Sequence, residues 1–309
     1  MRKRWRLVPL AFLLGILLAA DWPQLQGPRR DGHAADEPLL EALPASGPPV
    51  LWKRALGEGF SSPVVVGGQV LMFHRIGGTE VLECLEAANG KVRWTFRYPT
   101  RYEDAYAKGN GPRSTPVVAD GRVFLLGAEG MLHAVEFSTG KKLWNRALAE
   151  DYRIPPSFFG VATTPLVEGK KVLVNVGGED GAGIVAFDVA TGKELWKATD
   201  QQASYSSPIA ATIDDVRHVF FFTREGLVSI DPESGAVRFS KRWRSRINAS
   251  VNAAMPVLVG KEHVFLSSSY QTGAILLRVQ KDRVREAWSN DTSLSCHYST
   301  PVLVGDHLY

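Results

Sequence analysis

Three groups of residues in this sequence could do chemistry, although none completes a catalytic motif. Arg113 follows a Gly-Pro pair in GNGPRSTPVV, and its planar guanidinium could bind a carboxylate through two parallel hydrogen bonds; an arginine in a loop otherwise tends to be solvated or to bridge structural units. Cys296 and His297 could supply a thiolate and an imidazole, but neighbours on an extended strand point to opposite faces. Glu179 and Asp180 in GGEDGAG could bind calcium, or could form a solvated hairpin tip.

A repeated turn is the first element that could position these residues. A turn, a glycine and an aromatic residue four positions later recur in EAANGKVRW, EFSTGKKLW, DVATGKELW and DPESGAVRF. An acidic side chain can accept hydrogen bonds from backbone N–H groups two or three residues on, and glycine supplies the positive φ of a tight turn. Each copy therefore predicts a turn that enters a strand, whose aromatic ring packs against a neighbouring repeat; a tryptophan cage for a ligand is the alternative. The glycines are Gly90, Gly140, Gly192 and Gly235, and the aromatic residues are Trp94, Trp144, Trp196 and Phe239, with Trp52 and Trp288 assigned the same structural role.

A second mark gives the period of the repeat. A small or polar pair precedes a proline and a mostly valine-rich strand at Pro63, Pro116, Pro165, Pro208, Pro256 and Pro301. The spacing of 43 to 53 residues matches a four-stranded propeller blade and exceeds that of short helical repeats. In the first period we expect strands at 63–66, 69–74, 79–87 and 91–97, because these runs are rich in β-branched and aromatic residues. The sequence therefore predicts an all-β fold, a β-propeller of four-stranded blades.

Composition along the chain predicts three segments. Residues 1–20 carry a basic stretch and then an apolar run too short to span a bilayer comfortably, which is typical of a signal peptide, with an uncleaved anchor as the alternative. Residues 21–49 are rich in proline, glycine and charge and predict an extended arm and linker. Residues 50–309 form the propeller. Trp52 predicts the last strand of a repeat whose other strands lie elsewhere, and the sixth repeat stops at Tyr309, so we expect five complete blades and a truncated sixth in a fragment.

Charge and cysteine content argue against two kinds of site. The net charge is +4, but four of the 36 Lys and Arg residues lie in the first twenty positions, and the rest match the 32 Asp and Glu residues. The body of the protein therefore has no electrostatic case for binding nucleic acid. Cys84 and Cys296 are the only cysteines, which supports neither a disulfide scaffold nor a cysteine-based zinc site. We expect Cys84 to be a small buried hydrophobic residue.

The repeats resemble those of the PQQ-binding-like (quinoprotein-type) β-propeller family, which includes BamB-like outer-membrane assembly scaffolds. The region from Trp52 to Tyr309 carries the resemblance, together with DWPQLQGPRRDG and GNGPRSTPVV. It implies about seven or eight blades in the complete protein, and a first strand of each blade nearest a central channel. The residues before each proline mark would then surround one mouth of that channel. They are Phe60, Arg113, Ala162, Tyr205, Ala254 and Tyr298, with Asn252 and His297 close by.

The resemblance implies two main functions. The first is an exported, non-catalytic scaffold in the periplasm or outside the cell, similar to BamB in envelope protein assembly, with a protein partner, no cofactor and no transmembrane span in the mature chain. The alternative is a PQQ-dependent alcohol or sugar dehydrogenase, with the quinone and calcium near Arg113, Tyr205, Asn252 and His297. The adjacent cysteine pair expected of such dehydrogenases is absent, as is a lipid-accepting cysteine after the apolar run. A carbohydrate-binding module is a third class that the fold allows.

Overall fold

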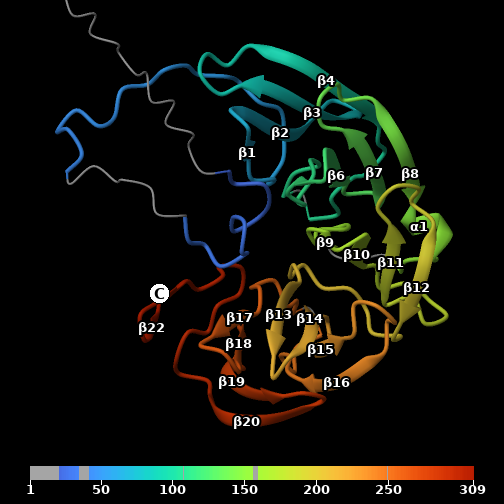
Figure 1. Ribbon diagram of the computed structural model, residues 1–309, viewed down its shortest axis with the longest axis vertical. Helices are drawn as coiled ribbons and strands as arrows, with labels where there is room; N and C mark the ends of the chain where they lie inside the picture. The colour runs from blue at the N-terminus through green and yellow to red at the C-terminus, as the bar shows by residue number, and fades with distance from the viewer. Residues whose placement is uncertain (1–20, 35–41, 107, 156–158, 249) are drawn as a thin grey trace, which may run out of the picture.

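The computed structural model describes residues 21–34, 42–106, 108–155, 159–248 and 250–309. In this part of the chain, five four-stranded antiparallel sheets and one two-stranded sheet are arranged around a partial ring (Figure 1). The strands of each sheet follow one another in the chain, so each four-stranded sheet is one blade. The predicted all-β fold of four-stranded blades is confirmed. The helix α1 (Leu148–Asp151) is a single turn between two blades.

The blades have the following strands. Blade 1 contains β1 (Val64–Val66), β2 (Gln69–Ile76), β3 (Thr79–Glu86) and β4 (Val92–Pro99); blade 2 contains β5 (Val117–Ala119), β6 (Arg122–Leu126), β7 (Met131–Glu136) and β8 (Lys142–Ala147). Blade 3 contains β9 (Leu166–Glu168), β10 (Lys171–Asn175), β11 (Ile184–Asp188) and β12 (Glu194–Ala198); blade 4 contains β13 (Ile209–Ile213), β14 (Val216–Phe222), β15 (Gly226–Ile230) and β16 (Val237–Arg242). Blade 5 contains β17 (Val257–Val259), β18 (His263–Ser268), β19 (Gly273–Gln280) and β20 (Arg283–Asn290), and the last pair is β21 (Leu303–Val304) and β22 (His307–Leu308).

The antiparallel order sorts the connections onto two faces of the ring. The turns after the first and third strands of each blade lie on one face, which we call the turn face. The turns after the second strands lie on the opposite face, the loop face. The long connections between blades, at 100–116, 148–165, 199–208, 243–256 and 291–302, also lie on the loop face. Each first strand therefore starts at the loop face, directly after its proline mark.

The hydrophobic core lies mainly between neighbouring blades. One cluster joins Phe124 and Leu132 of blade 2 to Val172 and Phe187 of blade 3, and another joins blades 4 and 5. Both faces of an inner sheet are covered in this arrangement, so β15 is buried along its whole length instead of alternating between buried and exposed positions. Packing between adjacent blades is thus the main source of hydrophobic stabilisation.

The repeated turn forms the joint between consecutive blades. The indole N–H of Trp144 in blade 2 donates a hydrogen bond of 3.0 Å to the Val189 carbonyl in blade 3, and its ring covers Gly192. A Cβ atom at Gly192, which has φ of 69°, would approach the indole ring to 2.6 Å. Trp94 and Trp196 make the same contacts with the turns at Gly140 and Gly235. Glycine is therefore required at this position by backbone conformation and by the close approach of the ring.

The acidic residue of the turn acts differently in different copies. Asp188 Oδ1 accepts hydrogen bonds from the backbone N–H groups of Ala190 and Thr191, at 3.1 and 2.8 Å. Asp231 accepts the equivalent pair in blade 4. In the turns that begin with glutamate, the carboxylate instead binds a side chain, as Glu86 does with Asn89. The longer glutamate side chain does not accept the pair of backbone hydrogen bonds that the aspartates accept. The glycine of these turns nevertheless keeps its positive φ.

Trp52 makes the blade joint without belonging to a strand. Its indole N–H donates to the Ala87 carbonyl at 2.7 Å and its ring covers Gly90. Residues 51–57 nevertheless form no ladder, so the prediction of a strand at Trp52 is wrong. The chain pairs with β2 only after this segment, in an isolated bridge between Glu58 and Arg75. In β20, Trp288 has the position of the other joint residues, but 40% of its surface is exposed.

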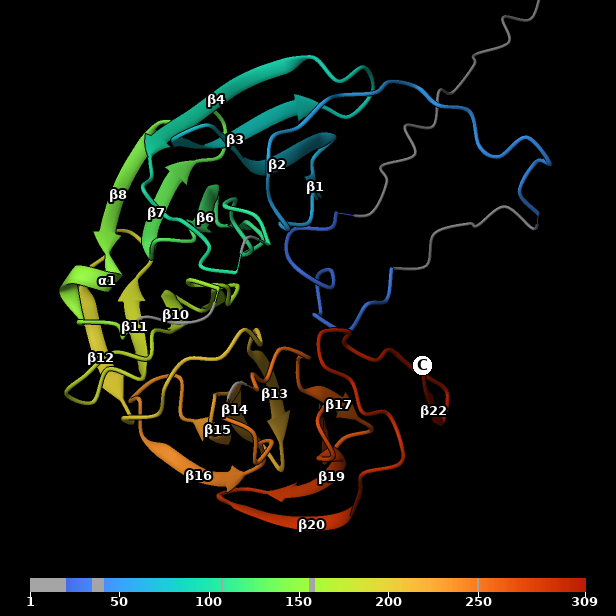
Figure 2. The same cartoon turned by 180° about the vertical axis from the view of Figure 1, so that it is seen from behind.

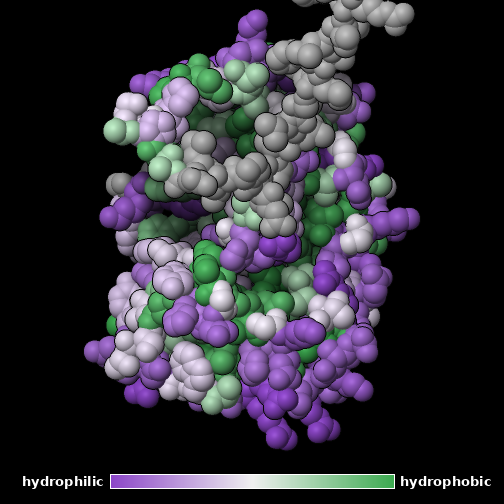
Figure 3. Space-filling model, turned by 60° about the vertical axis from the view of Figure 1, so that its left-hand side comes forward, coloured by the Kyte–Doolittle hydropathy of each residue, from purple (hydrophilic) through white to green (hydrophobic). Residues whose placement is uncertain are grey.

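The predicted N-terminal arm starts inside the partial ring. Residues 24–32 form bends and turns, and Figures 1 and 2 both show the chain from Asp21 to residue 34 between blade 1 and the β21–β22 pair. Figure 3 brings this side of the molecule forward and shows hydrophobic residues exposed among hydrophilic ones on its surface. From Asp21 onward, no helix in the described ranges is long and apolar enough to cross a membrane.

Candidate functional site

The loop face carries the residues predicted to surround the channel mouth. Phe60, Arg113, Ala162, Tyr205, Ala254 and Tyr298 all precede first strands on this face. The structure brings them to one side of the molecule, but it engages several of them in contacts within the protein. The roles of these residues differ, and we describe them one group at a time.

Arg113 is enclosed by its own loop. Its Nη2 donates to Asp104 Oδ2 at 2.7 Å and to the Gly109 carbonyl at 3.0 Å, and Nη1 donates to the Gly111 carbonyl at 3.1 Å. The Asp104 side chain is fully buried and also accepts hydrogen bonds from the backbone N–H groups of residues 106 and 108. The guanidinium therefore closes the loop from 104 to 113. This geometry does not support the prediction that Arg113 binds the carboxylate of a quinone.

Aromatic rings cover the guanidinium of Arg113. The Phe60 and Tyr102 ring centroids lie 5.3 and 5.4 Å from its central carbon, and that of Phe159 lies at 6.0 Å. Phe159 also packs against Tyr106 and Tyr205. Burial raises the pKa of the Tyr102 hydroxyl. A cluster of aromatic residues from four segments is thus held around one buried ion pair.

Asn252 links blades 4 and 5 through hydrogen bonds. Its Nδ2 donates to the carbonyls of Thr223 and Trp243 at 2.9 and 3.2 Å, and its Oδ1 accepts from Ser268 Oγ at 3.0 Å. The backbone carbonyl of Asn252 accepts from the N–H groups of residues 205 and 206. Only 2% of the residue is exposed. Its polar atoms are engaged in these contacts, so this geometry does not support the prediction of a ligand contact.

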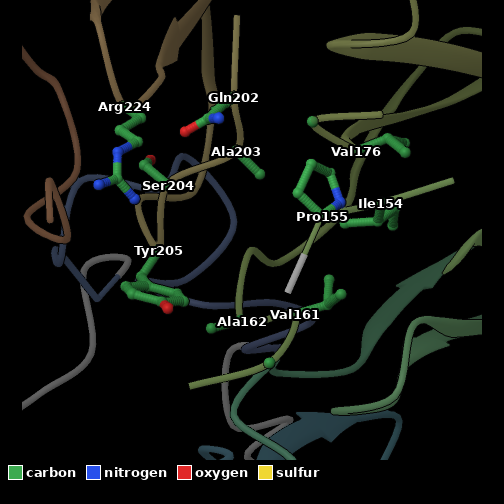
Figure 4. Close-up of a pocket in the computed structure, with 12 residues that line it drawn as sticks. Ile154, Pro155, Val161, Ala162, Val176, Gln202, Ala203, Ser204, Tyr205 and Arg224 are labelled. Carbon is green, nitrogen blue, oxygen red and sulfur yellow. The ribbon is translucent and has the colours of Figure 1, made fainter. Parts of the chain in front are cut away.

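Tyr205 lines a small pocket between blades 3 and 4. Its hydroxyl accepts a hydrogen bond of 2.8 Å from the Phe159 backbone N–H. The pocket has a volume of about 60 Å³, which is too small for a quinone cofactor. Figure 4 shows Gln202, Ser204 and Arg224 with Tyr205 on one side of it, and the apolar side chains Ile154, Val161 and Val176 on the other. Sequence analysis missed these wall residues, because they come from four separate connections.

His297 and Cys296 lie in the connection that follows β20. The His297 ring is 3.9 Å from the Tyr298 ring centroid and 5.0 Å from that of Tyr270, and its Nε2 has no partner among the described residues. Burial lowers the pKa of this imidazole. The backbone N–H of Cys296 donates to Ser267 Oγ at 2.8 Å, and both cysteines are free thiols. The environment of His297 is aromatic and does not provide a charged partner.

Glu179 and Asp180 form an exposed hairpin tip. Both carboxylates pair with Arg153, and their side chains are 57% and 74% exposed. Across the described ranges, no group of three or more His, Cys, Asp or Glu side chains is placed to hold a metal ion. Cys84, by contrast, is completely buried, and burial raises the pKa of its thiol to about 11.

Exposed aromatic and aliphatic side chains are the feature of the loop face that sequence analysis largely missed. Phe60 and Tyr298 were predicted to lie there and are 58% and 61% exposed. Tyr106, Ile247 and Tyr270 join them from the other connections, each close to half exposed. Isolated exposed apolar residues are ordinary, but several on one face of a rigid framework are typical of a binding surface. The turn pattern gave no signal for them, because they lie in irregular connections.

The joints and proline marks define the class of this protein: it is a β-propeller built from PQQ-like repeats. The chain belongs to the family described as outer membrane protein assembly factor BamB, whose model matches residues 40–152 and 79–309. The resemblance inferred from the repeats is thereby confirmed.

Known proteins of two kinds are similar to this chain. The chain is 27% identical over 167 residues to outer membrane protein assembly factor BamB of Yersinia pestis, a match that covers 53% of this chain and 39% of that protein. It is also 27% identical over 150 residues to quinohemoprotein alcohol dehydrogenase ADH-IIG of Pseudomonas putida, covering 47% of this chain and 20% of that one. The matches thus span less than half the length of these curated relatives.

A solved structure supports the fold. The crystal structure of BamB from Moraxella catarrhalis superposes with a TM-score of 0.57 at 18% identity, covering 82% of this chain and 69% of the other. At this level of identity the similarity shows the propeller fold.

Proposed function

We propose that this chain is an exported, non-catalytic binding scaffold of the cell envelope, whose loop face binds a protein partner in outer membrane protein assembly. The observation that carries the proposal is the set of exposed aromatic side chains on loops that buried polar contacts hold in place. Membership of the BamB family and the signal-like residues 1–20 support an envelope location, periplasmic or secreted.

Rigid aromatic residues suit protein recognition. Tyrosine and phenylalanine bring a large contact area with few rotatable bonds, and aromatic residues are enriched at the centres of protein interfaces. The Arg113–Asp104 ion pair and the hydrogen bonds of Asn252 fix the backbone beneath Phe60 and Tyr205. A partner would therefore meet loops that need little ordering, which lowers the entropic cost of binding.

The dehydrogenase alternative rests on the quinohemoprotein relative. In that reading Arg113 and Asn252 would hold the quinone, but both are already satisfied by Asp104 and by backbone carbonyls. These contacts leave neither Arg113 nor Asn252 placed to hold a tricarboxylate cofactor. We derive no catalytic step from them.

The proposal is tested by binding measurements on the full chain. The probe is the purified periplasmic domain of the barrel-assembly machine, which the resemblance to BamB implies as a partner. We expect Phe60→Ser and Tyr298→Ser to weaken binding at least about tenfold each, as for interface residues that contribute on the order of 2 kcal/mol. Leu195→Ser is the matched control, because Leu195 is 46% exposed but lies at the turn face.

A calorimetric titration with pyrroloquinoline quinone and calcium completes the test. We expect no saturable binding. Saturable one-to-one binding of the quinone to the natural protein would contradict the scaffold proposal and favour the dehydrogenase. Equal weakening by Leu195→Ser would show that the loop face is not the interface.

A further inference from the structure

Residues 21–33 add to the inner edges of the first blades. The backbone N–H and carbonyl of Trp22 exchange hydrogen bonds with Val65 of β1 at 2.6 and 3.0 Å, and the Gly67 N–H donates to Asp21 Oδ1 at 2.8 Å. The next residue, Pro23, accepts a hydrogen bond of 2.8 Å from the Val118 N–H in β5. Trp22 and Pro23 thereby pair with backbone groups on the open edges of β1 and β5, which would otherwise lack these partners.

Arg30 holds the middle of the same segment. Its Nη1 donates to the Pro208 carbonyl at 2.9 Å, Nη2 donates to the Pro165 carbonyl, and Nε donates to Gln24 Oε1 at 2.8 Å. These prolines directly precede the first strands of blades 3 and 4. The residue is 5% exposed, and no carboxylate lies within ion-pair distance among the described residues. Burial lowers its pKa to about 9, so the guanidinium remains charged at neutral pH.

The segment ends on the last strand pair. His33 Nε2 lies 2.7 Å from the Leu303 carbonyl of β21, and Gly32 packs against the Val302 side chain, where a Cβ atom would approach to 2.8 Å. Between these points Leu25 packs on the core shared by blades 4 and 5. The segment therefore contacts blades 1 to 4, the core of blade 5 and the β21–β22 pair. Figure 1 shows it between blade 1 and the β21–β22 pair.

We propose that residues 21–33 are an internal clasp that fastens blade 1 to the β21–β22 pair along the inner strand edges, with Arg30 as its central anchor. Each blade packs against the next blade along the chain, whereas the clasp connects blade 1 directly to β21. It also forms part of the wall of a cavity of about 480 Å³ between the first strands of blades 3 to 5. A small molecule bound in this cavity would contact residues of the clasp.

The contacts of the clasp are expected to form cooperatively. Ordering each residue of such a segment costs roughly 1–2 kcal/mol of conformational entropy, which one hydrogen bond does not offset. The contacts at Val65, Val118, Arg30 and Leu303 must therefore form together. Loss of the central anchor should release both ends, although these ends do not touch Arg30.

Hydrogen exchange of the full chain tests the clasp, with Arg30→Met compared with Arg29→Met. Arg29 is the matched control because its side chain is 63% exposed and pairs with Asp31 inside the segment. In Arg30→Met we expect the amides of Val65, Gly67 and Val118, and those of residues 302–309, to exchange at least about tenfold faster. In Arg29→Met the same amides should stay within about twofold of the natural protein.

The location of the change distinguishes a clasp from a local contact. Faster exchange confined to residues 163–168 and 206–211 would show that Arg30 only fastens blade 3 to blade 4, and would overturn the proposal. His33→Ala covers the case in which Arg30→Met does not fold, since it removes one contact at the far end. It should accelerate exchange at 302–309 and, more weakly, at Val65; an unchanged Val65 would also contradict the clasp.

Discussion

His133 lies in an aromatic cluster between blades 1 and 2. Its ring centroid is 4.1 Å from that of Tyr98 and 5.1 Å from that of Phe96, and its Nδ1 has no hydrogen-bond partner among the described residues. Burial, with a smaller contribution from Lys142, lowers the pKa of this imidazole to about 4. Burial also lowers the pKa of His218 to about 4. Both histidines are therefore neutral in the native protein at neutral pH.

Stability should consequently fall in mild acid. Below about pH 6.5 the unfolded chain binds protons at these histidines that the native state does not bind until about pH 4. Within that window each histidine can reduce the free energy of unfolding by up to about 1.4 kcal/mol per pH unit. The measurement is urea unfolding of the natural protein and His133→Phe at pH 7.5 and 5.0. We expect the variant to lose less stability on acidification; an identical loss would show that His133 does not titrate in this way.

The joint tryptophans allow a direct comparison at the same structural position. Trp144 is 8% exposed and donates a hydrogen bond to blade 3, whereas Trp288 is 40% exposed. Trp144→Ala removes a buried ring and leaves a cavity, so we expect a loss of about 3–5 kcal/mol in the free energy of unfolding. Trp288→Ala should cost clearly less, about 1 kcal/mol, because part of its ring already contacts water. Equal losses in urea unfolding would contradict the idea that the joint contact is what stabilises the blades.

At the scale of elements, the connection from 100 to 116 contains a buried ion pair between Arg113 and Asp104. Arg113→Ala would leave the Asp104 carboxylate buried beside backbone N–H donors but without a positive charge. Removing one partner of a buried pair costs about 3–5 kcal/mol. We expect a large fall in the unfolding midpoint and rapid proteolysis within 103–112. Arg101→Ala, in the same connection but exposed, should change neither; a stable Arg113→Ala protein would show that the aromatic cluster alone holds the loop.

Sequence alone predicted the regular elements of this fold well. The proline mark and the glycine turn recur because each blade needs the same strand entry and the same joint, so the expected strands of blade 1 agree with β1–β4 to within two residues. Trp52 was misassigned to a strand because its position matches that of the tryptophans at the blade joints. The joint requires only the indole ring, not a strand that carries it.

The irregular elements could not be predicted in the same way. Arg113 was predicted to bind a carboxylate because its guanidinium can form two parallel hydrogen bonds. Its partner, Asp104, lies in a connection whose residues follow no periodic pattern. Arg30 lies in a segment rich in proline and glycine, and two of its three acceptors are backbone carbonyls, which every residue carries. Contacts of this kind leave no signature in residue types, so only the folded chain reveals them.

At the scale of the whole molecule, stability has two sources with different ranges. The core clusters and tryptophan joints act between adjacent blades, so their contributions add up along the chain. Residues 21–33 contact strands that are far apart in the sequence, which couples blade 1 to the β21–β22 pair. A protein of this design can have locally independent blades and yet lose its overall shape through a change in one short segment.

The contact between Asp21 and Gly67 also gives the molecule a polarity. Gly67 belongs to the turn between β1 and β2, so Asp21 lies at the turn face. A surface or partner that holds Asp21 would therefore hold the protein by that face. The aromatic loops would point the opposite way, as a platform presented outward from its point of attachment.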